Sequence, residues 1–162
     1  MFKATLVTTS LALLVAVSGV VQATTFREIF EVAVTIPVAE FYVIPSEPGW
    51  IHQQQLLPYS PITNRLAPLR KNFDVKNTHG GISARLSVEP YLSNGQAGDD
   101  IPLIVTFNSK RLTMDAEEVI SELDGRAGRR VGLEVAAVEV PNGYQPGSYY
   151  GSVYMIFEAL AP

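Results

Sequence analysis

Residues Phe26 to Val38 read Phe-Arg-Glu-Ile-Phe-Glu-Val-Ala-Val-Thr-Ile-Pro-Val. Apart from Glu28, every even-numbered position is apolar, whereas the odd-numbered positions include Arg27, Glu31 and Thr35. This period of two predicts a strand with one apolar face, about 43 Å long at roughly 3.3 Å per residue. Such a strand, close to a chain terminus, can leave its own domain and complete the sheet of another chain.

The residues before this stretch resemble a secretory signal peptide. Lys3 is followed by an apolar run from Leu11 to Val21 and then by Val21-Gln22-Ala23, a small-residue cleavage pattern. The apolar run is too short for a membrane-spanning helix, which needs about 20 residues. We therefore predict a signal peptide at residues 1–23, an amino-terminal extension at residues 24–38 and one folded domain at residues 39–162. A bend is expected at Pro37, which cannot donate to a strand ladder.

The composition excludes several classes of function. The formal charge of −4 becomes −5 when Lys3 is removed, and no basic cluster exceeds Arg129-Arg130 or Arg70-Lys71. Nucleic acids and anionic membranes are therefore poor candidates for partners. The chain has no cysteine, so an exported product gains no disulfide and has no thiolate for metal binding or catalysis.

The middle of the chain shows strand periodicity interrupted by turns. Ala39 to Ile44 is apolar, and the proline-rich segment from Ile51 to Pro68 predicts short edge strands and turns. Alternating residues around Phe73 and Val75 and from Ile82 to Val88, separated by Asn77 to Gly81, predict a β-hairpin.

Further strands are expected along the second half. Ile101 to Phe107 is apolar on both faces, as in a central strand, and Val131 to Ala137 alternates. Asp115 to Leu123 fits either a helix or a short strand through Val119 and Ile120. Tyr149 to Ala159 predicts a long final strand. These elements favour an all-β antiparallel β-sandwich, with a barrel as the alternative.

No arrangement of residues indicates catalysis. His52 and His79 lie in predicted loops without ligand-like neighbours, and Asp99-Asp100 lacks the carboxylate spacing of a calcium loop. No serine lies in a Gly-x-Ser-x-Gly elbow, and Gly80-Gly81 precedes a strand rather than a helix. We expect no enzyme activity, no cofactor and no metal site.

Three stretches together resemble the CS1-type (α-class, CFA/I-like) fimbrial major subunits, which are pilins assembled by a chaperone and an usher in Gram-negative bacteria. The stretches are Phe30 to Pro37, then Ala84 to Asn94 followed by Ile101 to Phe107, and finally Gly143 to Val153. They occur in order over most of residues 24–162. Their order and the absence of cysteine carry the resemblance.

The resemblance implies an incomplete immunoglobulin-like β-sandwich, completed by a donor strand from a neighbouring subunit. It implies a structural subunit of an adhesive fibre, exported through the periplasm to the cell surface. The implied partners are identical or related pilin subunits in a head-to-tail polymer, a periplasmic chaperone, an outer-membrane usher and a host receptor. The implied donor residues are Phe30, Val32, Val34, Ile36 and Val38. The implied residues of the acceptor groove, which also contact the chaperone, are Tyr150, Val153, Tyr154, Met155 and Phe157.

The alternative hypothesis is a self-contained exported β-sandwich that binds a carbohydrate or protein ligand. In that protein, Phe26 to Val38 would be an ordinary first strand paired within its own domain. The pattern of residues alone fits both hypotheses, and the resemblance favours the intermolecular strand.

Overall fold

The computed structural model describes residues 40–140 and 143–162, which belong to a compact unit spanning Pro37–Pro162. The predicted signal peptide and the whole of the predicted extension lie outside the described residues. In the described part of the chain, no helix is long and apolar enough to cross a membrane. In chain order, the elements are β1 (Phe41–Pro45), the 3-10 helix η1 (Trp50–His52), β2 (Tyr59–Ser60), β3 (Arg65–Leu66), β4 (Leu69–Asn77), β5 (Ile82–Leu86), β6 (Tyr91–Leu92), β7 (Ile101–Phe107), β8 (Lys110–Arg111), β9 (Glu117–Ile120), α1 (Glu122–Ala127), β10 (Arg129–Ala137) and β11 (Met155–Ala159).

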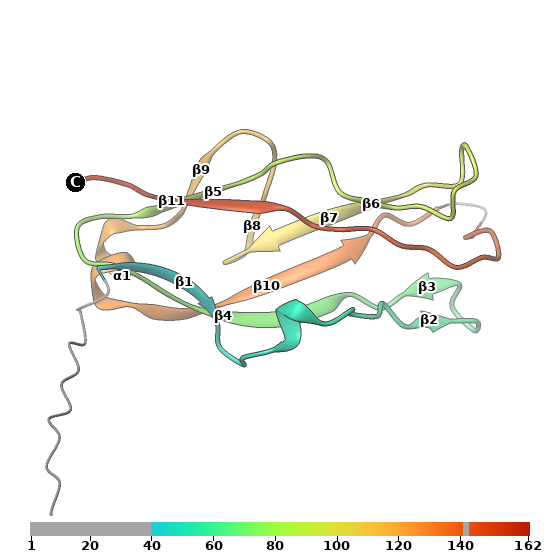
Figure 1. Ribbon diagram of the computed structural model, residues 1–162, viewed down its shortest axis with the longest axis horizontal. Helices are drawn as coiled ribbons and strands as arrows, with labels where there is room; N and C mark the ends of the chain where they lie inside the picture. Colours follow the sequence, from blue (N-terminus) through green and yellow to red (C-terminus); the bar gives the residue numbers. More distant parts are fainter. Residues whose placement is uncertain (1–39, 141–142) are drawn as a thin grey trace, which may run out of the picture. The chain divides into compact units, whose positions relative to one another are not determined.

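The strands form two main antiparallel sheets and a small hairpin. The larger sheet has the order β1-β4-β10-β7-β6, with β8 also paired to β7, and the smaller sheet has the order β11-β5-β9. In Figure 1, α1 lies at one end of the molecule and the β2–β3 hairpin at the other. The sheets are separate and do not close on one another, which confirms the predicted antiparallel sandwich and removes the barrel alternative.

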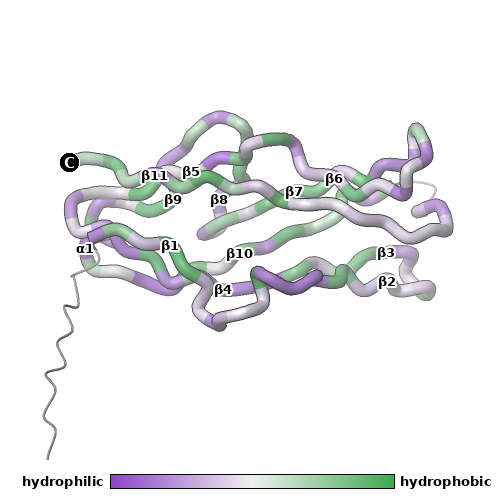
Figure 2. Tube along the Cα trace, in the orientation of Figure 1, coloured by the Kyte–Doolittle hydropathy of each residue, from purple (hydrophilic) through white to green (hydrophobic). Residues whose placement is uncertain are grey.

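The core lies between the two sheets and is built by strand alternation. In β7, residues Ile101, Leu103, Val105 and Phe107 are buried while their neighbours are not, and β10 alternates in the same way from Val131 to Val135. The hydrophobic positions recur along the strands of both layers (Figure 2). Aromatic rings join the layers, because Phe107 of the larger sheet lies 4.9 Å from Phe157 of β11 between ring centroids.

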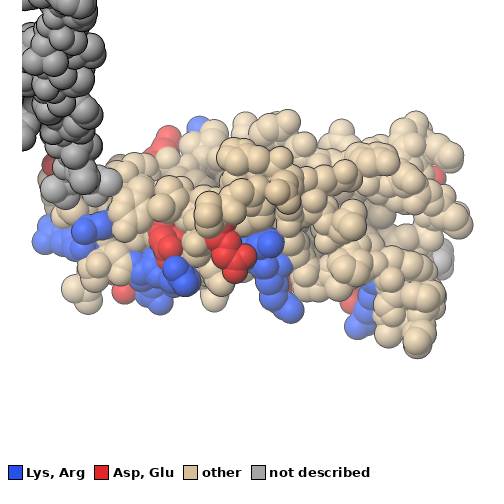
Figure 3. Space-filling view, turned by 60° about the horizontal axis from the view of Figure 1, so that its bottom comes forward, with Lys and Arg blue, Asp and Glu red and all other residues tan. Residues whose placement is uncertain are grey.

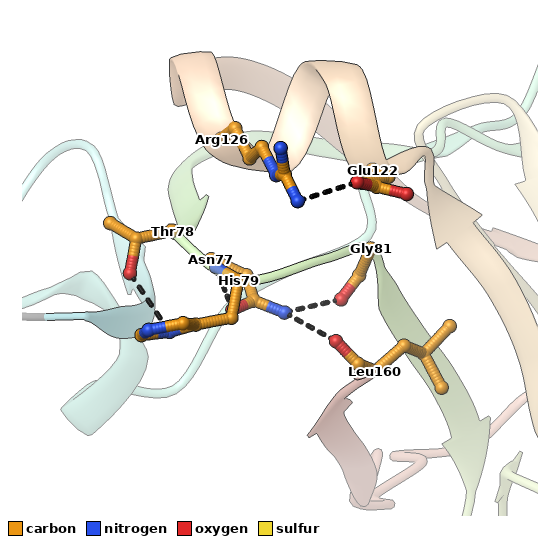
Figure 4. A network of polar contacts seen from close by, with 7 residues as sticks. All are labelled: Asn77, Thr78, His79, Gly81, Glu122, Arg126 and Leu160. Atoms are coloured by element: carbon orange, nitrogen blue, oxygen red, sulfur yellow. Dashed lines mark hydrogen bonds and ion pairs between the residues drawn. The ribbon is translucent and has the colours of Figure 1, made fainter. Parts of the chain in front are cut away.

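The predicted hairpin between Phe73 and Val88 is wrong, since β4 and β5 lie in different sheets. The turn between them crosses from one layer to the other. Asn77, the last residue of β4, is only 2% exposed and holds this turn. Its Nδ2 donates to the carbonyl oxygens of Gly81 (2.7 Å) and Leu160 (3.0 Å) (Figure 4). The backbone N–H of His79 donates to Asn77 Oδ1 at 3.2 Å. A buried amide with these partners fixes the crossover and the end of the chain together.

The segment from Asp115 to Leu123 contains the strand rather than the helix. β9 uses Val119 and Ile120, both fully buried, to cover the core. The helix α1 follows and is capped by Ser121, whose hydroxyl oxygen accepts a hydrogen bond from the backbone N–H of Asp124. The cap thus marks the point at which strand changes to helix.

The outer face of the larger sheet carries paired charges. Arg130 donates two hydrogen bonds to the Asp74 carboxylate, at 2.8 and 3.0 Å, and Arg70 pairs with Glu134 at 2.7 Å. Figure 3 shows basic and acidic side chains side by side on this face. The hydrogen bond from Arg130 lowers the pKa of Asp74 below its ordinary value. The pairs are exposed, so they keep this face soluble more than they stabilise the fold.

Candidate functional site

One side of the sandwich is sealed by the chain itself. The N–H of Leu112 donates to the carbonyl oxygen of Val105 in the larger sheet, and the N–H of Leu86 in the smaller sheet donates to the carbonyl oxygen of Thr113. The segment between β8 and β9 thus bonds to both layers, and Leu112 is 4% exposed. The nearby core residues Val119 and Ile120 are fully covered.

The opposite side is bounded by the two edge strands β1 and β11. Within residues 40–140 and 143–162, each of these strands has a partner on one side only, β4 for β1 and β5 for β11. Figure 1 is viewed from this side: β11 lies in the upper layer, and β1 and β4 lie in the lower layer. Among the described residues, no backbone hydrogen bond joins β1 to β11. We call this face the open side.

The core is incompletely covered along the open side. The side chains here pack against the buried cluster but remain only partly buried, as do Leu92 of β6 and Ala137 of β10 elsewhere in the sandwich. They come from three stretches: the segment from β1 to β2, the start of β4, and the last segment of the chain. They are Val43, Trp50, Leu57, Leu69, Val153, Met155 and Phe157.

The last segment places the five predicted acceptor residues on two faces. Val153, Met155 and Phe157 share the inner face and contact the core, and Phe157 lies 6.5 Å from Phe73 between ring centroids. Tyr150 and Tyr154 point outward and are 66% and 58% exposed. The structure therefore brings three of the five together. The predicted donor residues Phe30, Val32, Val34, Ile36 and Val38 lie outside the described residues.

The final strand is shorter than the sequence indicates. Regular pairing with β5 begins only at Met155 and runs to Ala159. Before it, Tyr150 exchanges two backbone hydrogen bonds with Ser93 in an isolated bridge, and the N–H of Ser87 donates to the carbonyl oxygen of Tyr154. The outer edge of this whole segment faces the open side.

Sequence reasoning missed Trp50, the only tryptophan of the chain. Its ring lies edge-on to Phe73 with centroids 5.8 Å apart, and Lys71 Nζ lies 5.3 Å from its centroid. The indole Nε1 is buried without a hydrogen-bond partner. Trp50 belongs to a three-residue 3-10 turn, so no strand or helix period could have identified it as a lining residue.

The open side is chemically different from the outer face of the larger sheet. Its lining side chains are apolar, whereas the outer face carries ion pairs. In the part of the chain that the structure describes, no cluster of His, Asp or Glu could hold a metal ion. Partly buried apolar side chains beside two strand edges that lack a partner among the described residues suit an extended apolar peptide, which can cover these side chains and pair with an edge at the same time.

The fold is that of a pilin subunit. A solved structure titled "Structure of the CooA pilin subunit from enterotoxigenic Escherichia coli" matches with a TM-score of 0.61 and 24% sequence identity, covering 74% of this chain and 87% of that chain. At this identity, the likeness shows the fold. A comparison with curated proteins found no match.

The family follows from the sequence of almost the whole chain. The model of the CS1 type fimbrial major subunit matches residues 27–158, so the chain belongs to that family. It is a structural pilin subunit of a surface fimbrium. The resemblance noted in the sequence is thereby confirmed.

Proposed function

We propose that this subunit polymerises by donor-strand exchange, in which residues 24–38 of one copy lie as an added strand along the open side of the next. The observation that carries the proposal is the set of partly buried apolar side chains, among them Val43, Met155 and Phe157, that lie at the β1 and β11 edges of the core. An extended segment with one apolar face could cover these side chains, and Phe26 to Val38 has that pattern.

A joint of this kind is stable without a covalent bond between the subunits. Burying Phe30, Val32, Val34, Ile36 and Val38 stabilises the contact by roughly 8–15 kcal/mol as an upper bound, at about 1.5–3 kcal/mol each. Ladder hydrogen bonds satisfy the backbone groups of the two unpaired edges. This suits a chain without cysteine, in which no disulfide can hold subunits together.

The proposal includes the route and the earlier partners. Residues 1–23 direct export, and a periplasmic chaperone covers the open side until an outer-membrane usher exchanges it for the next extension. Val153, Met155 and Phe157 line the acceptor, with Tyr150 and Tyr154 at its outer edge. The resulting fibre is adhesive and has a receptor on the host.

Two variants that are each unable to polymerise, one with a defective donor and one with a defective acceptor, are expected to form a single joint when they are mixed. Val34→Asp damages the donor and leaves the acceptor intact, whereas Val153→Asp places a charge on the inner face of the acceptor and leaves the donor intact. Each chain from Thr24 is expected to form no polymer alone. Mixed, they are expected to give a complex of one copy of each and nothing longer, measured by native mass spectrometry.

The control for the acceptor is Ser152→Asp, because Ser152 is exposed beside Val153. This variant is expected to polymerise like the unmodified chain. A mixture of the two defective chains that gives no complex, or one that gives long polymers, contradicts donor-strand exchange along this edge.

A further inference from the structure

A pocket of about 460 Å³ lies at the end of the open side that is formed by β2 and β3. Leu57 and Leu92 line it and also pack against the core, while Leu66 of β3 and Tyr149 close its sides. None of the described residues that line it is Lys, Arg, His, Asp or Glu. Its described lining is therefore uncharged, and it shares Leu57 with the partly buried side chains of the open side.

The extension of the same subunit leaves from the other end of the molecule. The N–H of Thr78 donates to the carbonyl oxygen of Glu40 at 2.8 Å, which fixes Glu40 beside the crossover that packs on α1. The nine residues of β4 separate this end from the pocket by about 30 Å. Val38, two residues before Glu40, reaches only about 7 Å from it. A subunit therefore cannot place its own Val38 in its own pocket.

The position of Glu40 decides how a donor can be oriented in a fibre. If the carboxyl end of the donor lay at the α1 end of the acceptor, the α1 ends of two subunits would meet, an arrangement that favours a closed pair with mutual exchange. If it lies at the pocket end, each subunit joins the next head to tail and the contact repeats without closing, as a filament requires. The donor then runs antiparallel to β11.

We propose, on the basis of donor-strand exchange, that the pocket binds Ile36, Pro37 and Val38 of the following subunit. This segment is uncharged, like the pocket, whereas the other end of the extension carries Arg27, Glu28 and Glu31. The pocket thus fixes the direction of the donor and is the contact between successive domains.

The backbone at this end of the acceptor also suits Pro37. The regular ladder of β11 begins only at Met155, and the preceding residues make a single bridge to Ser93. Proline has no N–H to donate, so it fits where an added strand leaves a ladder and not in its middle. An antiparallel donor places Pro37 beside this irregular part.

Because the natural chain has no cysteine, pairs of introduced cysteines allow a direct test by disulfide cross-linking. The full chain from Thr24 is made with Val38→Cys and Leu56→Cys, since Leu56 lies on the rim of the pocket and is 76% exposed. The matched control is Val38→Cys with Leu123→Cys, since Leu123 belongs to α1 and is 81% exposed. Polymers formed under reducing conditions are then oxidised, denatured and separated on a non-reducing gel. Only cysteines with Cα atoms within about 7 Å can be bridged.

The pocket pair is expected to give a ladder of covalent multimers, and the α1-end pair is expected to remain monomeric. A ladder from the α1-end pair, or polymers without a ladder from the pocket pair, overturns the assignment of the pocket while donor-strand exchange stands. If neither chain forms polymers before oxidation although the cysteine-free chain does, the shared substitution Val38→Cys has blocked the joint. The pair Ile36→Cys with Leu56→Cys is then expected to give the ladder, and polymers of that pair without a ladder overturn the assignment of the pocket. If the cysteine-free chain itself forms no polymer, donor-strand exchange fails as well.

Discussion

A chain carrying Val34→Asp is expected to form no polymer at concentrations at which the unmodified chain forms fibres. Val34 lies in the middle of the apolar pattern of the extension. In the proposed joint, the substitution therefore replaces an apolar side chain that would be buried with a carboxylate. An unpaired buried ion costs several kcal/mol, and each 1.4 kcal/mol weakens association tenfold. The joint is therefore expected to weaken by about a thousandfold or more, measured by light scattering.

The matched control is Thr35→Asp, which introduces the same charge one position along the chain. Thr35 is on the polar face of the predicted strand, so this variant is expected to assemble nearly normally. Equal loss of polymer in both variants would indicate a general effect of charge and not the burial of one strand face. Normal fibres from Val34→Asp would contradict the donor assignment.

A second large effect is expected from Gly80→Ala, which acts on the stability of the domain. A Cβ atom at Gly80 would lie 2.1 Å from the carbonyl oxygen of Leu160, and a Cβ atom at Gly125 would come almost as close to the carbonyl oxygen of Gly80. Backbone must therefore move apart where the crossover, α1 and the end of the chain meet. We expect a loss of about 3 kcal/mol in the free energy of unfolding and a fall in Tm of about 10 °C.

The control for this effect is Gly132→Ala in the centre of β10. A Cβ atom there meets nothing within 4 Å, so the change is expected to be neutral or slightly stabilising. Both variants are compared by thermal unfolding in a monomeric form whose open side is filled by a fused donor strand. Similar melting temperatures for the two variants would show that the crossover is not closely packed.

Strand periodicity predicted the centre of the fold. The alternation in Ile101 to Phe107 and in Val131 to Ala137 reflects a face buried against the opposite layer, and both became strands of the larger sheet. Such local patterns record burial, which each strand experiences along its whole length. The fold class and the family followed from them and from their order.

The connections between strands could not be predicted in the same way. The sequence Asn77 to Gly81 signals a turn, but a turn can return within one sheet or cross to the other. Here the choice depends on Asn77 binding Leu160, which is 83 residues away in the sequence. Contacts of this range leave no local periodicity.

The candidate site was predictable only in part. The sequence named five residues of the last segment, Tyr150, Val153, Tyr154, Met155 and Phe157, without indicating which face of the strand contacts the core, because both faces carry large apolar or aromatic side chains. Trp50 and the pocket depend on segments without regular structure, such as the turn at η1 and the loop before Tyr149. Their positions follow from how the loops pack, and not from any pattern of residues.

The most direct test of the central claim is size-exclusion chromatography with light scattering on three forms of the chain. The first is the chain from Thr24, the second lacks residues 24–36, and the third lacks the free extension but carries the sequence of Phe26 to Val38 after Pro162. A short flexible linker suffices in the third form, because Leu160 lies at the α1 end, where an antiparallel donor begins.

Donor-strand exchange predicts that the first form polymerises and that the third is a stable monomer. The second form is expected to be unstable alone, because its open side has no occupant. If instead the first form is a stable monomer, and removal of the extension merely unfolds it, the strand belongs to its own domain and the account is contradicted.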